Sequence, residues 1–255
     1  MSAIKNVTLV GGTGHLGSFV LDKLLASDKF NVQILQRTSS SSAYAPTVKV
    51  VRADFEDPQS LTAVLKGGNA VVPKTPDRCC NRRRCETFSS SNFGSNMSNP
   101  NSRKLFVFKD KVIIEDYLIG KSETTDLTYT LVYTGPFTDF AIQNKSRGRH
   151  PAETQNRAVY VPESFISQNQ LLSFAKHIAP NKPWAPVDAD LNVAVAGALE
   201  RLAQGQHDFP TVIPILLKSV VDNEYGPNFA ENDNELLGIT EKGDEYLIEL
   251  LNPLL

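Results

Sequence analysis

The stretch VTLVGGTGHLG, residues 7–17, sets an apolar run directly before a cluster of four glycines. Beyond the glycines, Leu16, Val20 and Leu24 recur at the spacing of one face of a helix. An apolar run, a glycine turn and an amphipathic segment, in this order, predict a β-strand, a tight turn and an α-helix.

The four glycines fit a phosphate-binding turn. Gly12, Gly14 and Gly17 satisfy G-x-G-x-x-G, and Gly11 with Gly14 and Gly17 satisfies G-x-x-G-x-x-G. Such glycines let backbone N–H groups approach a pyrophosphate, and the helix N-terminus favours the anion. A glycine-rich turn without a ligand is the alternative interpretation. We expect a cofactor to be held by Gly11, Gly12, Thr13, Gly14, His15, Leu16 and Gly17.

Strand-like and helix-like segments alternate after this unit. The runs FNVQILQR (30–37) and VKVVRADF (48–55) are typical of buried strands, and NAVV (69–72) follows as another apolar piece. Between them, Asp57 and Pro58 are typical of the cap and the first residue of a helix. This alternation predicts an α/β fold with a doubly wound parallel sheet covered on both faces.

The end of the second predicted strand indicates which dinucleotide is bound. An acidic residue about 20 positions beyond the glycines would hold the ribose of NAD, but Arg37 stands there. A guanidinium suits the 2′-phosphate of NADP, so we expect NADP(H) as the cofactor. A solvated surface arginine is the alternative. Asp54 is expected to face the adenine edge, with a helix-capping role as the other interpretation.

Composition excludes several classes of partner. The 26 Lys and Arg residues against 28 Asp and Glu give a net charge of −2, which leaves no basic face for nucleic acid or an anionic membrane. We find neither a signal-peptide pattern nor a run of about 18 apolar residues, so a cytoplasmic protein with a small-molecule substrate is expected. Cys79, Cys80 and Cys85 lack a fourth ligand at a suitable spacing, so no metal site is expected.

Four stretches resemble the NmrA-like and isoflavone-reductase-like branch of the short-chain dehydrogenase superfamily, particularly its fungal members. They are VTLVGGTGHLGSFVLDKLL, FGSNMSNPNSRKLFVFKDKVIIEDYL, LTYTLVYTGPFTDF, and NRAVYV together with DNELLGI. The resemblance implies an NADP-binding Rossmann domain, which we place at residues 1–144, and a smaller, reduced α/β substrate domain at 145–255. It implies an NADPH-dependent reductase of a small hydrophobic or aromatic carbonyl or enone in secondary metabolism. The alternative is a non-catalytic, redox-sensing regulator of a protein partner.

The same resemblance places the catalytic lysine at Lys109. Lys111 is a near neighbour, and an alignment shifted by two residues would assign the role to Lys111 instead. The Tyr-x-x-x-Lys spacing of ordinary short-chain dehydrogenases occurs at Tyr117 and Lys121. We interpret that pair as unrelated to catalysis, because Lys121 would lie at the far end of its helix. The substrate pocket is expected to include Tyr133, Pro136 and Phe137, although Tyr133 and Phe137 are also typical core residues.

The sequence departs from the family pattern in two places. Residues 74–91 hold four arginines and three serines, with prolines at 73 and 76 and almost no apolar periodicity, so they predict an irregular connection. Asn92 stands where the family would show a glutamate. After AIQNK (141–145) much of the first substrate-domain segment is missing. The chain is therefore either a shortened paralogue or a translation with misread exon junctions.

The C-terminal half carries further helical patterns. Ser167 and Gln170 form a capping box before an amphipathic helix whose inward face includes Leu171, Leu172 and Ala175. The segment KPWAPVDAD (182–190) is expected to be a strand, and LNVAVAGALERLAQG (191–205) a helix.

Overall fold

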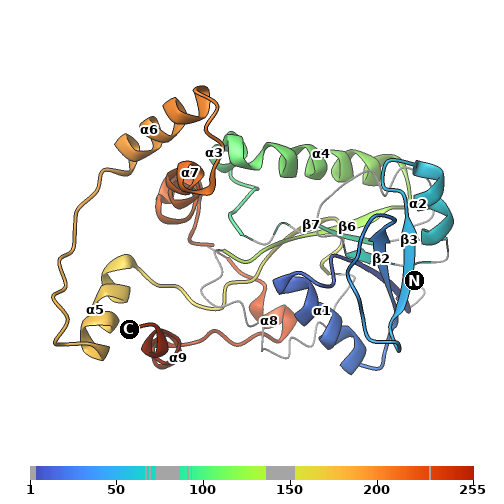
Figure 1. The fold of residues 1–255 in the computed structure, drawn as a ribbon, viewed down its shortest axis with the longest axis horizontal. Coiled ribbons are helices and arrows are strands. Elements are labelled where there is room, and N and C mark those ends of the chain that lie inside the picture. The colour runs from blue at the N-terminus through green and yellow to red at the C-terminus, as the bar shows by residue number, and fades with distance from the viewer. Residues whose placement is uncertain are drawn as a thin grey trace.

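A parallel β-sheet forms the centre of the fold (Figure 1). The computed structural model describes residues 4–66, 68, 70–72, 87–90, 92, 94–135, 153–229 and 231–255. Within them seven strands lie in the order β3-β2-β1-β4-β5-β6-β7, and each neighbouring pair is parallel. The strands are β1 (Asn6–Val10), β2 (Asn31–Arg37), β3 (Lys49–Ala53), β4 (Ala70–Val72), β5 (Thr87–Ser90), β6 (Thr128–Tyr133) and β7 (Arg157–Tyr160). The predicted doubly wound parallel sheet is confirmed.

Helices cover both faces of this sheet, with α4 above it and α1 below it in Figure 1. On one face α1 (His15–Ala26) packs Leu21 against Leu9 and Ile34. On the other face α2 (Pro58–Leu65) and α4 (Lys109–Thr124) bury apolar side chains against the sheet. The core of that second face includes Leu35, Leu61, Leu65, Leu118, Leu131 and Tyr133.

Local sequence signals fix several helix starts. The carboxylate of Asp57 accepts the N–H groups of Gln59 and Ser60 at 2.9 and 3.2 Å, and Pro58 is the first residue of α2. At the start of α5 (Gln168–Ile178), the Ser167 hydroxyl and the Gln170 side chain cap each other's backbone N–H groups. Both caps were predicted and are confirmed.

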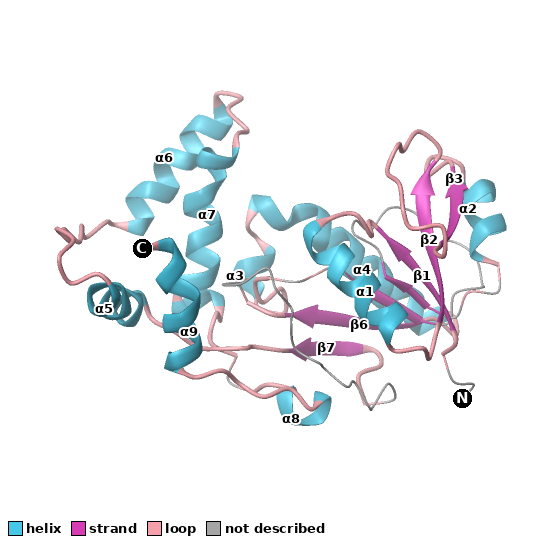
Figure 2. Ribbon diagram, turned by 60° about the horizontal axis from the view of Figure 1, so that its bottom comes forward, coloured by secondary structure: helices cyan, strands magenta, loops and turns pink. Residues whose placement is uncertain are grey.

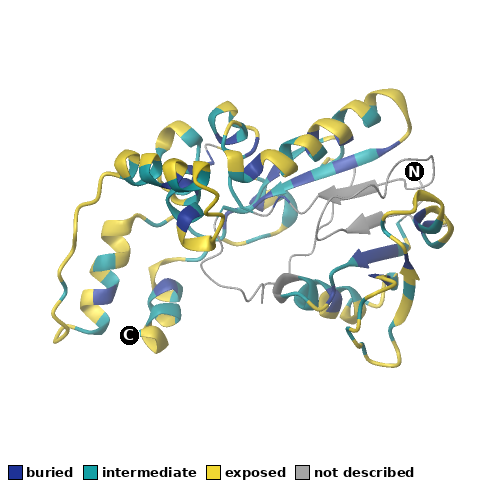
Figure 3. Ribbon diagram, turned by 45° about the horizontal axis from the view of Figure 1, so that its top comes forward, coloured by how far each residue is buried: buried dark blue, intermediate teal, exposed yellow. Residues whose placement is uncertain are grey.

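After β7 the chain is mostly helical. It contains α5, α6 (Leu191–Ala203), α7 (Phe209–Val221), a 3-10 turn η2 (Asn223–Tyr225), α8 (Asn234–Leu237) and α9 (Asp244–Leu251). Yellow stretches along the ribbons of these helices in Figure 3 mark exposed residues, which make up much of the chain after β7. Two short pieces, α3 (Pro100–Arg103) and the 3-10 turn η1 (Phe106–Phe108), precede α4. Within the described part of the chain, none of these helices is both long and apolar enough to cross a membrane.

The C-terminal part is fastened to the edge of the sheet at β7. The Asp233 N–H donates to the Tyr160 carbonyl at 2.8 Å, and the Asp233 carboxylate accepts the Tyr160 N–H at 2.8 Å. The same carboxylate pairs with Arg157 at 2.5 Å. Figure 2 shows β6 and β7 side by side and pointing the same way. The predicted domain boundary at residue 144 therefore falls between two strands of one sheet.

Three sequence predictions about local structure are wrong. Residues 87–90, assigned to an irregular connection, form β5, which pairs with β4 and β6; residues 73–86 lie outside the described residues. The segment 182–190 is not a strand, since Pro183 and Pro186 provide no N–H donor for a sheet. Leu171 is 42% exposed rather than inward.

Candidate functional site

All carboxyl ends of the parallel strands meet at one edge of the sheet, which is where ligands bind in open α/β folds. The glycine turn follows β1 at this edge, and Arg37 ends β2. Asn92 follows β5, and Tyr133 ends β6. The topology therefore gathers residues far apart in sequence along one edge.

The glycine turn brings α1 against the end of β1. Gly11 has a φ of 81°, in the region that favours glycine, and its carbonyl accepts the Gly14 N–H at 3.0 Å. A Cβ on Gly17 would lie 2.0 Å from the Gly11 carbonyl oxygen, so only glycine allows this approach. Gly14 caps α1 without a side-chain hydrogen bond, and the first turn of α1 holds no acidic residue. These features fit a pyrophosphate on the N-terminus of α1.

The loop after β2 folds back over the glycine turn. Gln36 donates through its amide to the Ser42 carbonyl at 2.8 Å, and the Ser42 hydroxyl lies 3.5 Å from that of Thr13. The ring of Tyr44 lies 3.2 Å from the point that a Cβ on Gly12 would occupy. The turn and this loop thus form one packed unit. The side chains of His15 and Leu16 lie outside the described part of the structure.

Arg37 is exposed, and its guanidinium lies 5.5 Å from the ring centroid of Phe55. Arg52, on the neighbouring strand, donates to the carbonyls of Thr38 and Ser40 at 3.3 and 2.9 Å. Two guanidinium groups therefore flank the turn that follows β2. Asp54 is exposed too, and its carboxylate accepts the Glu56 N–H at 2.9 Å in a local turn.

The two lysines at the start of α4 differ in their surroundings. Lys109 is the first residue of the helix and is exposed. Lys111 is partly buried, and this burial lowers its pKa, while the negative charge of Glu115 opposes the shift. Tyr117 is 40% exposed further along α4, with the Lys121 ammonium 5.5 Å from its ring centroid.

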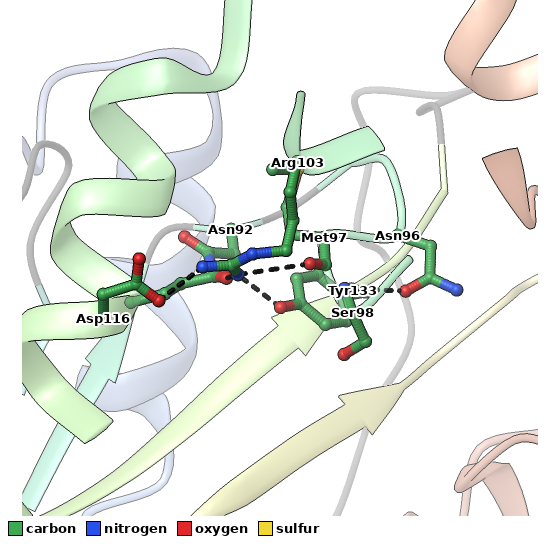
Figure 4. A network of polar contacts seen from close by, with 8 residues as sticks. Asn92, Asn96, Met97, Ser98, Arg103, Asp116 and Tyr133 are labelled. Atoms are coloured by element: carbon green, nitrogen blue, oxygen red, sulfur yellow. Dashed lines mark hydrogen bonds and ion pairs between the residues drawn. The ribbon is translucent and has the colours of Figure 1, made fainter. Parts of the chain in front are cut away.

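A buried polar cluster lies between α4, α3 and the ends of β5 and β6 (Figure 4). At its centre the Glu115 carboxylate, 1% exposed, accepts the Tyr133 hydroxyl and an Arg103 guanidinium N–H, each at 2.7 Å. The Asn92 side-chain amide donates to the same carboxylate, and Arg103 also pairs with Asp116. Burial raises the pKa of Glu115, and burial together with the Glu115 charge raises that of Tyr133.

Tyr133 is fully buried, and its ring centroid lies 5.6 Å from that of Tyr160. Tyr133 therefore belongs to the hydrophobic core, and its place in the substrate pocket stays a prediction. Pro136 and Phe137 lie outside the described residues. The place of Glu115 at the centre of this cluster was not predicted, because its only local signal in the sequence is its spacing of four residues from Lys111 on one helix.

Among the described residues, no group of three or more His, Cys, Asp or Glu side chains is arranged to hold a metal ion. Cys79, Cys80 and Cys85, at which the sequence predicts no metal site, lie outside that part of the chain.

Comparison with known proteins gives a family match over the glycine turn and the strands that follow. Residues 11–78 match the model of the NAD(P)H-binding family. The oxidoreductase aprR of Aspergillus flavus is 23% identical over 296 residues, which cover 96% of this chain and 98% of that protein. Because the aligned length exceeds 255 residues, the relative has segments that this chain lacks.

Solved structures share the fold over nearly the whole chain. A crystal structure of isoflavone reductase superposes with a TM-score of 0.73 at 15% identity, covering 99% of this chain and all of that one. The complex of AtPrR2 with NADP+ and (+)pinoresinol superposes with a TM-score of 0.66 at 16% identity, covering 98% and 100%. Residues 11–78 are therefore similar to the NAD(P)H-binding family, and the chain has the Rossmann-type fold seen in isoflavone reductase.

Proposed function

We propose that this chain is an NADPH-dependent oxidoreductase that reduces a small hydrophobic or aromatic carbonyl or enone in secondary metabolism. The observation that carries the proposal is the approach of Gly17 to the Gly11 carbonyl, which sets the N-terminus of α1, not capped by any side chain, at the carboxyl edge of the sheet, where a pyrophosphate would bind. The matches to an NAD(P)H-binding family and to a fungal oxidoreductase support it.

The bound cofactor would supply the hydride, and residues of the chain would hold the cofactor in position. The backbone N–H groups between Gly11 and Gly17 would hold the pyrophosphate. Arg37, exposed at the end of β2, would hold the 2′-phosphate, which makes NADPH the preferred cofactor. We also propose that Asp54 faces the adenine edge of the cofactor.

Hydride addition to a carbonyl leaves an oxygen that needs a proton, and the start of α4 offers two lysines as donors. Lys109 is the residue that the sequence predicts. Lys111 has the stronger structural support, because burial lowers its pKa toward the range in which an amine serves as a general acid. We therefore propose Lys111 as the proton donor and Lys109 as the alternative.

Substrate-dependent oxidation of NADPH, measured with a panel of aromatic ketones and enones, tests this function. We expect Lys111→Ala to lower kcat by about two to four orders of magnitude, with NADPH affinity within about tenfold. Lys121→Ala, at the far end of the same helix, is the matched control and should change kcat little. A greater loss in Lys109→Ala than in Lys111→Ala would return the role to Lys109.

The absence of turnover with the whole panel would contradict the reductase proposal. Binding of a protein partner that changes between NADP+ and NADPH, without turnover, would support the regulator instead.

A further inference from the structure

The Glu115 carboxylate collects donors from three separate segments of the chain. Asn92 reaches it from just beyond the end of β5, Arg103 from α3, and Tyr133 from the end of β6. Since each of these elements is fixed elsewhere, the carboxylate is the point at which they meet. Its position on α4 places that point one helical turn beyond Lys111.

The hydrogen-bond donors around Glu115 indicate that its carboxyl group is ionised. A carboxylate only accepts hydrogen bonds, whereas a protonated carboxyl also donates one. All three partners donate to Glu115, and one of them is a permanently charged guanidinium. A buried charge is costly unless it is paired and hydrogen-bonded, and apolar residues would fill such a position at least as stably. This balance favours a role for the charge beyond stability.

Lys111 is the charged group on which the Glu115 carboxylate can act electrostatically. Residues four apart on a helix share a face, and Lys111 is partly buried on the same stretch of α4. The charged and titratable groups that face Glu115 are Arg103 from α3, Tyr129 and Tyr133 from β6, and Lys111 and Asp116 from α4.

We propose that Glu115 is a positioning residue of the reductase site: its buried carboxylate joins Asn92, Arg103 and Tyr133 and presents a fixed negative charge to the ammonium group of Lys111. This inference rests on the proposed function and extends it to the group that acts on the proton donor. The charge stabilises the protonated amine, so Lys111 stays protonated to a higher pH than burial alone would allow.

The test removes the charge of residue 115 and keeps the size and shape of its side chain. In Glu115→Gln the alkaline limb of the kcat profile should move to lower pH by about one unit, the usual effect of removing a nearby opposite charge. Asp116→Asn is the matched control, because Asp116 also pairs with Arg103 but is largely exposed; its profile should match that of the unmutated protein.

A second readout does not need turnover. Acetic anhydride acetylates only the unprotonated amine, so the pH midpoint of Lys111 labelling, read by peptide mass spectrometry, reports its protonation. That midpoint should fall by about one unit in Glu115→Gln and stay unchanged in Asp116→Asn. Where Glu115→Gln does not fold, the double variant Asn92→Glu/Glu115→Gln returns a carboxylate to the cluster and should restore both folding and the midpoint.

The outcomes separate this inference from the proposed function. An unchanged Lys111 midpoint in folded Glu115→Gln would overturn the inference even if the protein is an active reductase. A shifted midpoint in a protein that turns over no substrate would support the link between the two residues while removing the reductase proposal. Failure of the double variant to restore a lost fold would also overturn the inference.

Discussion

Replacing Gly17 with alanine should push α1 away from the end of β1, where the phosphate-binding turn lies. The added Cβ would lie 2.0 Å from the Gly11 carbonyl oxygen and 2.8 Å from its carbon, whereas ordinary contact begins at 3.4 Å. The obstacle is backbone, so no side chain can rotate away, and α1 must move by more than 1 Å. Overpacking of this kind costs about 3 kcal/mol, which lowers Tm by about 6 to 12 °C in a chain of this size.

The same movement should weaken cofactor binding. Displacing α1 by more than 1 Å removes at least two charge-assisted N–H bonds to a pyrophosphate, at about 1.5 kcal/mol each, or about a hundredfold in Kd. Isothermal titration with NADPH measures the affinity, and differential scanning calorimetry measures Tm.

Gly120→Ala is the matched control for this variant. No atom lies within 4 Å of the Cβ position on Gly120, which is an exposed residue within α4. Alanine should stabilise the helix there by about 0.5 to 1 kcal/mol and leave NADPH affinity unchanged. Gly17→Ala with an unchanged Tm and an NADPH affinity within threefold of the unmutated protein would show that the close approach of α1 to Gly11 is not required for the fold or for cofactor binding.

Three further changes test other parts of the structure. Asn92→Glu places a second carboxylate against buried Glu115, so we expect a loss of about 3 to 5 kcal/mol in urea unfolding; no loss would show that the cluster tolerates a second charge. Tyr133→Phe removes a hydrogen bond to a charged group and should cost about 1.5 to 3 kcal/mol in the same assay, and an unchanged midpoint would argue against that bond. Asp57→Ala removes the cap of α2 and should cost about 1 kcal/mol without affecting NADPH binding; weaker binding would place α2 in the cofactor site.

The sheet and the cofactor turn could be predicted because their signals are local. The apolar run, the glycines and the following helix stand within 20 residues, and the caps at Asp57 and Ser167 are read from three or four neighbouring residues. The alternation of strands and helices then indicates a parallel sheet, whereas the order of its strands comes from the structure.

The parts that sequence reasoning missed depend on contacts between distant segments. The strand at 87–90 closely follows three arginines and itself ends in two serines, and it is defined by pairing with β4 and β6 on its two sides. The Glu115 cluster joins residues 92, 103, 115 and 133, of which only the spacing from Lys111 is visible along the chain. Leu171 fits a helical stripe, but the structure leaves that side of α5 exposed.

Titration of the full chain with NADPH and NADH, alongside Arg37→Ala, shows whether the carboxyl edge of the sheet binds a dinucleotide. We expect NADPH to bind more tightly than NADH, and Arg37→Ala to remove this preference by losing about 1.5 to 3 kcal/mol of NADPH binding. Failure of the unmutated chain to bind either nucleotide would contradict the claim that the edge of this sheet is a dinucleotide site.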